Sequence, residues 1–147
     1  MANCFENIIA EQMLPAKIVW VSAAALIDRD GRVLLAQRPE GKELAGLWEF
    51  PGGKIEPHET PEAALVRELK EELAIDTSCS CLAPVTFSSY RYEKFHLIMQ
   101  LYACRVWQGH VAPQEGQKLS WVYPKDFDKY AMPPADIPLI PAIRELL

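Results

Sequence analysis

Residues 53–75 read GKIEPHETPEAALVRELKEELAI, a stretch that predicts a glycine-led loop followed by a helix. Thr60 is suited to cap this helix, and Pro61 is suited to its first position. No helix breaker follows, so we expect a helix over residues 61–74. Its apolar residues recur at helical spacing and predict one buried face: Leu65, Val66, Leu69 and Leu73.

Three glutamates of this helix point to a metal site. Glu68, Glu71 and Glu72 are spaced i, i+3 and i+4, so they share one face. Their repulsion would be relieved by a divalent cation, and a ligand set made only of oxygen suits Mg²⁺ or Mn²⁺. A solvated acidic surface is the alternative for the glutamates taken by themselves. The preceding FPGGK at 50–54 favours the cation, because glycine lets the backbone pass close to a metal or phosphate.

The spacing of these residues resembles the box of the Nudix family, G-x5-E-x7-R-E-U-x-E-E-x-G-U, in which U is bulky and apolar. The chain meets this pattern at eight positions: Gly53, Glu59, Arg67, Glu68, Leu69, Glu71, Glu72 and Ile75. One position departs from it, since the penultimate glycine is Ala74. That departure affects the turn that ends the helix and removes no metal ligand.

The flanking sequence resembles the MutT branch of the same family. The similar segments are LAQRP at 35–39, AGLWEFPGGK at 45–54, EGQ at 115–117 and PPAD at 133–136. The resemblance implies an α/β/α sandwich with a mixed β-sheet over residues 16–147. Residues 1–15 lie outside it as an N-terminal extension.

The resemblance also implies a reaction. In the MutT branch, water attacks a phosphorus of a nucleoside triphosphate and releases nucleoside monophosphate and pyrophosphate, with metal ions polarising the phosphates. By position, Glu72 is the principal metal ligand, and Glu68 and the Gly53 carbonyl lie beside it. Glu71 holds a second metal or its water. Glu115, in a polar loop, is a further ligand or a base. The catalytic set implied in this way is Glu68, Glu71 and Glu115.

The same resemblance implies roles for five other residues. Arg38 is expected to bind phosphate, with a surface salt bridge as the alternative. Phe50 is expected to line the base pocket, with a place in the core as the alternative. Asp136 is expected to read the base, with capping of the final helix as the alternative. Arg67 is expected to brace the carboxylates of the box, and Glu59 to anchor its loop.

The base that we expect in the substrate depends on Asp136. The MutT pattern has asparagine at this position, which both donates and accepts, whereas an ionised aspartate only accepts. It therefore suits guanine N1–H and N2–H₂, or cytosine N4–H₂, unless burial raises its pKa enough for it to donate. We expect 8-oxo-dGTP first, and CTP or 5-methyl-dCTP as the alternative. A non-catalytic Nudix-like recognition module is disfavoured because all three helix glutamates are present.

The composition limits the possible partners. The chain has 147 residues, of which 50% are hydrophobic, and this suits one domain with a buried core. The formal net charge of −5 argues against a broad surface for duplex nucleic acid or a membrane. No apolar run is long enough to span a bilayer, and the first residues lack the basic start of a secretory signal. We therefore expect a cytoplasmic monomer whose partner is a small nucleotide.

The remaining pattern predicts strands on both sides of the central helix. A partly helical segment is expected over Glu6–Leu14, a helical turn over residues 124–130, and a final helix over residues 136–147. The expected strands cover residues 17–27, 32–37, 47–50, 84–92, 95–107 and 119–123.

Overall fold

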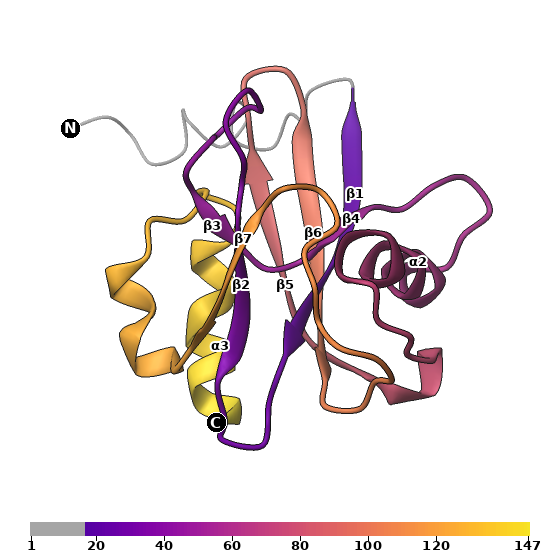
Figure 1. Ribbon diagram of the computed structural model, residues 1–147. Helices are drawn as coiled ribbons and strands as arrows, with labels where there is room; N and C mark the ends of the chain where they lie inside the picture. Colours follow the sequence, from indigo (N-terminus) through magenta and orange to yellow (C-terminus); the bar gives the residue numbers. More distant parts are fainter. Residues whose placement is uncertain (1–16) are drawn as a thin grey trace.

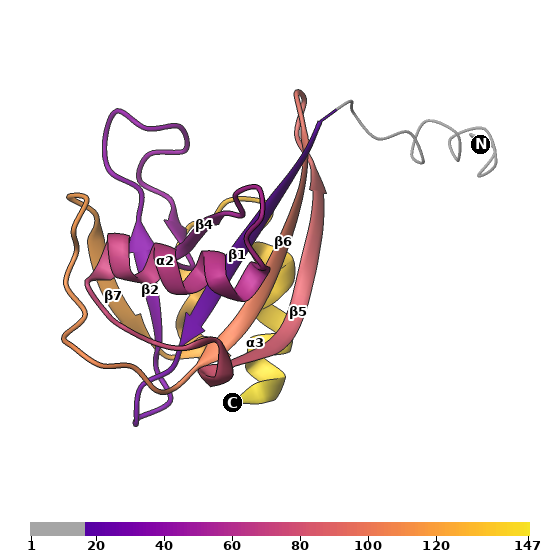
Figure 2. The ribbon, with the colours of Figure 1, turned by 90° about the vertical axis from the view of Figure 1, so that its right-hand side faces the viewer.

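The computed structural model describes residues 17–147 and places two β-sheets between helices (Figure 1). The helix α2 lies on one side of the strands and the helix α3 on the other (Figures 1 and 2). The predicted α/β/α sandwich is therefore confirmed. The expected N-terminal extension, with its helical segment at Glu6–Leu14, lies outside the described residues.

The larger sheet is mixed and has the strand order β4-β1-β6-β5. Strand β1 (Ile18–Leu26) is parallel to β6 (His96–Cys104) and antiparallel to β4 (Gly52–Lys54). Strand β5 (Leu82–Arg91) is antiparallel to β6 and forms the edge. The second half of β1 is buried on both faces, as is usual for a central strand covered by helices. The mixed sheet predicted from the sequence is thus present.

The smaller sheet is antiparallel and has the order β3-β2-β7. Its strands are β3 (Trp48–Glu49), β2 (Val33–Gln37) and β7 (Lys118–Val122). A turn in which Gly31 adopts a positive φ of 80° connects β1 to β2. This second sheet brings the loops that follow β2 and precede β7 to the same region of the molecule (Figure 1).

Helix α2 (Pro61–Leu73) forms where the sequence predicts it. Thr60 Oγ1 accepts a hydrogen bond from the Ala63 N–H at 3.1 Å, which satisfies one of the free donors of the first turn. Its buried leucines pack against one face of the larger sheet, and each contributes roughly 1.5–3 kcal/mol by burial. These residues are Leu65, Leu69 and Leu73.

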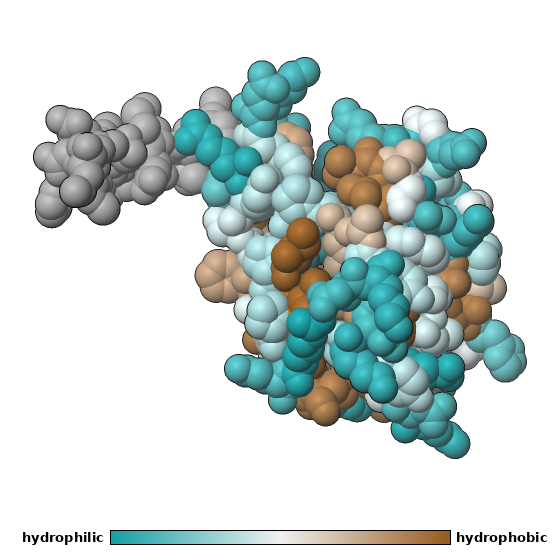
Figure 3. Space-filling view, turned by 90° about the vertical axis from the view of Figure 1, so that its left-hand side faces the viewer, coloured by the Kyte–Doolittle hydropathy of each residue, from teal (hydrophilic) through white to brown (hydrophobic). Residues whose placement is uncertain are grey.

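Helix α3 (Ile140–Leu146) covers the other face, and Ile140 and Ile143 enter the core on that side. Hydrophobic residues on the outer surface of this side form separate patches (Figure 3). The predicted start of the helix at residue 136 is wrong. Pro141 has no N–H to bond the Ile137 carbonyl, so residues 137–139 form a separate 3₁₀ turn, η3 (Ile137–Leu139).

Two strands also differ from what the sequence predicts. Strand β4 was not predicted, because a run of two glycines reads as a turn. The strand expected over residues 95–107 ends at Cys104, and the Val106 carbonyl accepts a hydrogen bond from Thr77 Oγ1 at 2.8 Å.

The other short elements are the 3₁₀ turns η1 (Cys79–Cys81) and η2 (Pro124–Lys129). No helix within residues 17–147 is both long enough and apolar enough to cross a membrane.

Candidate active site

The two glycines of β4 allow close contacts on two sides, with helix α2 at Gly53 and with strand β1 at Gly52. A Cβ atom on Gly53 would collide with the carboxyl group of Glu68, and one on Gly52 would collide with the Ser22 carbonyl. Both residues pair with β1, Gly53 opposite Ser22 and Gly52 opposite Ala23. The absence of a side chain on Gly53 therefore allows the Glu68 carboxylate to lie directly against the backbone of β4.

Arg67 connects the loop before α2 to the glutamates of the helix. Its Nε and Nη2 donate to the two carboxylate oxygens of Glu59, each at 2.8 Å. Its Nη1 donates to Glu68 at 2.9 Å and to Glu71 at 3.4 Å, and its Nη2 also donates to the Lys54 carbonyl at 3.2 Å. The hydrogen bonds from Arg67 lower the pKa of Glu59 to about 2, so Glu59 stays ionised. This arrangement ties the loop, β4 and the helix together.

Glu72 is partly buried, whereas its neighbour Glu71 is exposed. Its Oε2 accepts a weak hydrogen bond from the Gly52 N–H at 3.4 Å. Burial raises the pKa of Glu72 well above its usual range, and the negative charges of Glu68 and Glu115 raise it further. Three carboxyl groups from two separate segments of the chain thus act on one another electrostatically.

Glu115 reaches this region because its loop is attached to the end of α2. The Glu72 carbonyl accepts from the Gln114 N–H at 3.0 Å and from Gln117 Nε2 at 2.9 Å. The Gln117 side chain also accepts from the Glu115 N–H at 2.8 Å. Across the site, Lys42 Nζ lies 4.0 Å from the Glu115 carboxylate. The loop contacts therefore explain how a residue distant in sequence joins the helix glutamates.

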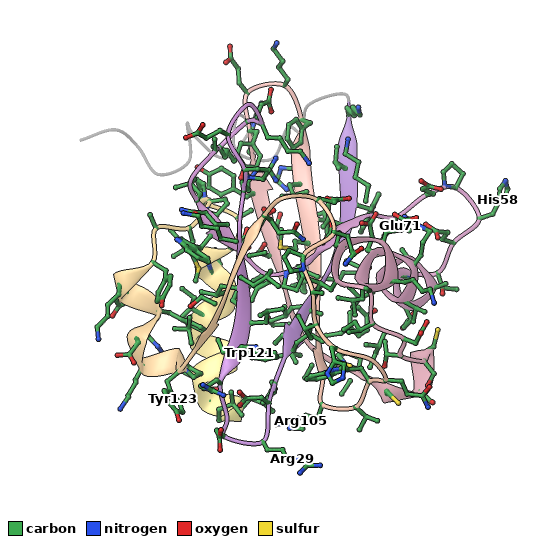
Figure 4. The ribbon with its side chains drawn as sticks, in the orientation of Figure 1. Arg29, His58, Glu71, Arg105, Trp121 and Tyr123 are labelled. Atoms are coloured by element: carbon green, nitrogen blue, oxygen red, sulfur yellow. The ribbon has the colours of Figure 1, made fainter. Side chains whose placement is uncertain are left out.

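These carboxylates are not arranged as a preformed metal centre. Within residues 17–147, no three Asp, Glu, His or Cys side chains meet in a way that would hold a metal. Glu68 is engaged by Arg67, and the Glu71 side chain is 55% exposed. Figure 4 shows Glu71 on α2 and His58 on the loop before it, which projects away from the sheets.

The chemistry of the group nevertheless fits a hard divalent cation. All the side-chain donors are carboxylate oxygens, which Mg²⁺ and Mn²⁺ prefer. Burial is the main cause of the raised pKa of Glu72, and the negative charges of Glu68 and Glu115 add a repulsion that a bound cation would relieve. Small rotations of these side chains, away from Arg67 and Lys42, would be needed for binding.

A second polar cluster lies around Asp136, next to η3. Asp136 is 1% exposed, and its Oδ2 accepts a hydrogen bond from the Phe50 N–H at 3.2 Å. Burial raises the pKa of Asp136 to about 8, and the nearby charge of Glu49 contributes to this rise. The neighbouring Ala135 carbonyl accepts from the buried Ser88 hydroxyl at 2.7 Å, which attaches this loop to β5.

The alternative that Asp136 caps the final helix is wrong. Asp136 has the helical dihedrals φ −82° and ψ −30°, and its side chain makes no capping hydrogen bond. A capping residue normally has extended dihedrals, which allow its side chain to reach the next amides. The Asp136 carboxyl group instead points toward the backbone between β3 and β4.

Arg38 and Phe50 are engaged by protein groups. Arg38 Nη1 donates to both Glu49 oxygens, at 3.1 and 3.2 Å, and its Nε donates to the Glu43 carbonyl. The Phe50 ring lies in the core at 5.9 Å from the Phe127 ring, so its main chain, rather than its ring, contacts Asp136. The structure thus places Arg38 near Asp136 through Glu49.

Glu49 was missed at the sequence level. Burial raises its pKa, while Arg38 lowers it. An acidic residue between Trp48 and Phe50, in a strand expected to be apolar, was the available signal.

Comparison with known proteins fits this geometry. A family model described as a NUDIX domain matches residues 22–142. The chain belongs to the Nudix family. It is 44% identical over 125 residues to a CTP pyrophosphohydrolase of Escherichia coli K12, and this match covers 84% of the chain and 90% of that protein. It is 36% identical over 105 residues to an 8-oxo-dGTP diphosphatase of Proteus vulgaris, with 71% and 91% covered.

A solved structure has a similar fold and sequence. The solution structure of the E. coli ORF135 protein superposes with a TM-score of 0.77 at 40% identity, covering 88% of this chain and 91% of that one. The helix of the Nudix box is capped at its C-terminal end by Ala74, which adopts the left-handed φ of 58° and ψ of 32°. The turn that the family builds with glycine is therefore retained here with alanine.

Proposed function

We propose that this chain is a metal-dependent nucleoside triphosphate pyrophosphohydrolase that releases nucleoside monophosphate and pyrophosphate. The observation that carries this proposal is the electrostatic coupling of Glu68, Glu72 and Glu115 beside the glycine backbone of β4. An anionic substrate would otherwise be repelled by these carboxylates, so a cation between them and the phosphates is required. Membership of the Nudix family supports the same reaction class.

We assign Mg²⁺, with Mn²⁺ as a substitute, to Glu72, Glu68 and the Gly53 carbonyl. Glu71 and Glu115 complete the set at a second cation. When bound, the metal polarises the phosphates and lowers the pKa of the attacking water. Arg67 holds Glu68 and Glu71 on one face, and its ion pair with Glu59 fixes the position of the guanidinium group. Glu68, Glu71 and Glu115 are the candidates for accepting the proton of the water.

For the substrate, we put 8-oxo-dGTP first and CTP or 5-methyl-dCTP second. Relatives bear both kinds of name, a CTP pyrophosphohydrolase and an 8-oxo-dGTP diphosphatase. The pKa of about 8 favours the first choice, because at pH 7 Asp136 is then mostly protonated. A protonated carboxyl group donates as well as accepts, as asparagine does in the MutT pattern.

We propose that the enzyme acts on the pool of free nucleotides in the cytoplasm. Removal of oxidised nucleotides there would act before DNA replication and would complement DNA repair. We assign a monomer, with Arg38 and Asp136 on the nucleotide and no role for duplex nucleic acid.

The test is a panel of 8-oxo-dGTP, dGTP, CTP and 5-methyl-dCTP, each with Mg²⁺ and with excess EDTA. We expect pyrophosphate release only with metal. Binding without turnover of any nucleotide would instead identify a recognition module, and metal-independent turnover would contradict the site.

Running the reaction in ¹⁸O-water locates the attack. We expect the label in pyrophosphate, from attack at the β-phosphorus. Label found only in the monophosphate would place the attack at the α-phosphorus and overturn this part of the proposal.

A further inference from the structure

The two arginines of the candidate site are already engaged by protein groups. All three guanidinium nitrogens of Arg67 donate to acceptors of the loop, β4 and the helix. Arg38 donates to the Glu49 carboxylate and to the Glu43 carbonyl. A triphosphate carries several negative charges and has to bind beside a group of carboxylates, which repel it. A cation that can change its partner at little cost would therefore assist binding.

Lys42, in the loop between β2 and β3, is such a cation. Its Nζ lies 4.0 Å from Glu115 Oε2, which is too long for a hydrogen bond. The two side chains are 53% and 47% exposed, and ion pairs between groups this exposed contribute little to stability. The loop that carries Lys42 and the loop that carries Glu115 lie at the same end of the molecule (Figure 2). Lys42 can therefore leave Glu115 without weakening the fold.

Lys42 lies between the carboxylates assigned to the metal and the cluster around Asp136. On one side it pairs with Glu115, whose charge acts on Glu72. On the other side is Glu49, where burial is the largest cause of a raised pKa and the charge of Lys42 is among those that lower it. A nucleotide that places its base at Asp136 and its phosphates at the metal therefore passes Lys42.

The backbone of this loop lets its tip move. Residues 40–46 are all exposed. Gly41 and Gly46 have positive φ angles of 85° and 84°, and a Cβ atom on either would meet nothing within 4 Å. These glycines therefore serve the path of the chain rather than close packing. The Gly46 N–H donates to the Arg38 carbonyl at 2.9 Å, so the loop is fixed at its base and exposed at its tip, where Lys42 lies.

We propose that Lys42 binds the phosphates beyond the α-phosphate, which leave as pyrophosphate. This inference rests on the proposed function. In the free chain Lys42 pairs with Glu115. When a cation takes the Glu115 carboxylate, the Lys42 ammonium moves to the phosphates beside it. Its direct contact is with Glu115, which places it on the metal side of the nucleotide, and a flexible ammonium group with three donors suits this exchange.

Calorimetric binding in the presence of Mg²⁺ tests the contact. The probes are a triphosphate with an imido group between its α- and β-phosphates, which resists the reaction, and the corresponding monophosphate. Lys42→Gln should weaken binding of the triphosphate by about tenfold, because it loses one charged contact to a phosphate. It should change the affinity for the monophosphate by less than about twofold. Lys42→Arg keeps the charge and should retain most of the affinity.

The matched control removes the same charge outside the site. Lys129, in η2, pairs with Asp126 at 3.1 Å, and Lys129→Gln should leave both affinities unchanged. In turnover assays Lys42→Gln should raise KM by about tenfold, whereas Lys129→Gln should not. The Tm of both variants should stay within about 2 °C of the native value, because both side chains are exposed.

The outcomes separate this inference from the proposed function. If the native chain turns over a nucleoside triphosphate but Lys42→Gln binds the imido analogue as tightly as the native chain does, the role of Lys42 is wrong and the proposed function stands. An equal loss of affinity for the triphosphate and the monophosphate also contradicts it, because Lys42 would then act on the α-phosphate or on the base. A native chain that binds no triphosphate overturns both.

Discussion

Burial is the largest cause of the raised pKa values of Glu72 and Asp136, as it is for Glu49. Glu72 and Asp136 differ in what surrounds them. Glu72 faces two further carboxyl groups, a conflict that a cation would remove, whereas Asp136 accepts a backbone N–H and lies near the Arg38–Glu49 pair. We therefore connect Glu72 with metal binding and Asp136 with recognition of a neutral base.

Glu72→Gln is predicted to abolish turnover while leaving the fold intact. The amide keeps the size of the side chain but lacks the charge that holds a cation, so kcat should fall by about three orders of magnitude or more. Circular dichroism should show an unchanged fold. Glu56→Gln, at an exposed residue in the loop before α2, is the matched control and should keep normal turnover. Near-normal turnover of the Glu72 variant would refute the assignment.

Asp136→Asn is predicted to change the pH dependence of stability. The pKa of Asp136 is about 8 in the folded chain and 3.8 at its ordinary value, so the folded state binds the extra proton between these limits. The stability contributed by that proton is complete below about pH 4 and is lost as the pH rises through 8, at up to about 1.4 kcal/mol per pH unit. Asparagine does not titrate, so this loss should disappear.

Urea unfolding of both proteins from pH 5 to 8.5 measures the effect. The variant should gain stability relative to the native chain as the pH rises. Asp128→Asn, at an exposed residue, is the control and should leave the profile unchanged. Parallel profiles for the native chain and the Asp136 variant would contradict the prediction. The same variant should alter the ratio of turnover between 8-oxo-dGTP and CTP.

At the scale of single elements, α2 was predictable and β4 was not. The signals for α2 are local, namely Thr60 as cap, Pro61 at the first position and leucines at helical spacing. Strand β4 exists because its two glycines pair with Ser22 and Ala23, about 30 residues earlier in the chain, and no local pattern reveals that pairing. The 3₁₀ turn before α3, in contrast, has a local cause, since Pro138 and Pro141 interrupt an otherwise helical pattern.

Ala74→Gly is predicted to stabilise the chain. Ala74 ends α2 in the left-handed region, which costs an alanine about 1–2 kcal/mol. Glycine relieves this cost but loses more backbone entropy on folding, so the net gain should be about 0.5–1 kcal/mol in urea unfolding. Ala63→Gly, inside the first turn of the same helix, is the control and should destabilise by a similar amount. A destabilised Ala74 variant would mean that the turn is not strained.

At the scale of the whole molecule, both sheets contribute to the candidate site. Strand β4 belongs to the larger sheet, on which α2 packs. Glu115 precedes β7 and Arg38 follows β2, and both of these strands belong to the smaller sheet. The box glutamates could be named from sequence because one helix holds them together. Two other contacts depend on how the two sheets meet. Arg38 pairs with Glu49, and Asp136 accepts a hydrogen bond from the Phe50 N–H.

Metal binding is predicted to stabilise the whole fold through these carboxylates. A cation that binds only the folded chain raises the free energy of unfolding by about 2.7 kcal/mol at one hundred times its Kd. For a chain of this size, that corresponds to a rise in Tm of roughly 5–10 °C on addition of Mg²⁺, reversed by EDTA. Glu72→Gln removes the proposed principal ligand, so its Tm should rise by less than about 2 °C, whereas Glu56→Gln should respond like the native chain. An equal rise in the Glu72 variant would show that Glu72 is not the principal ligand of Mg²⁺.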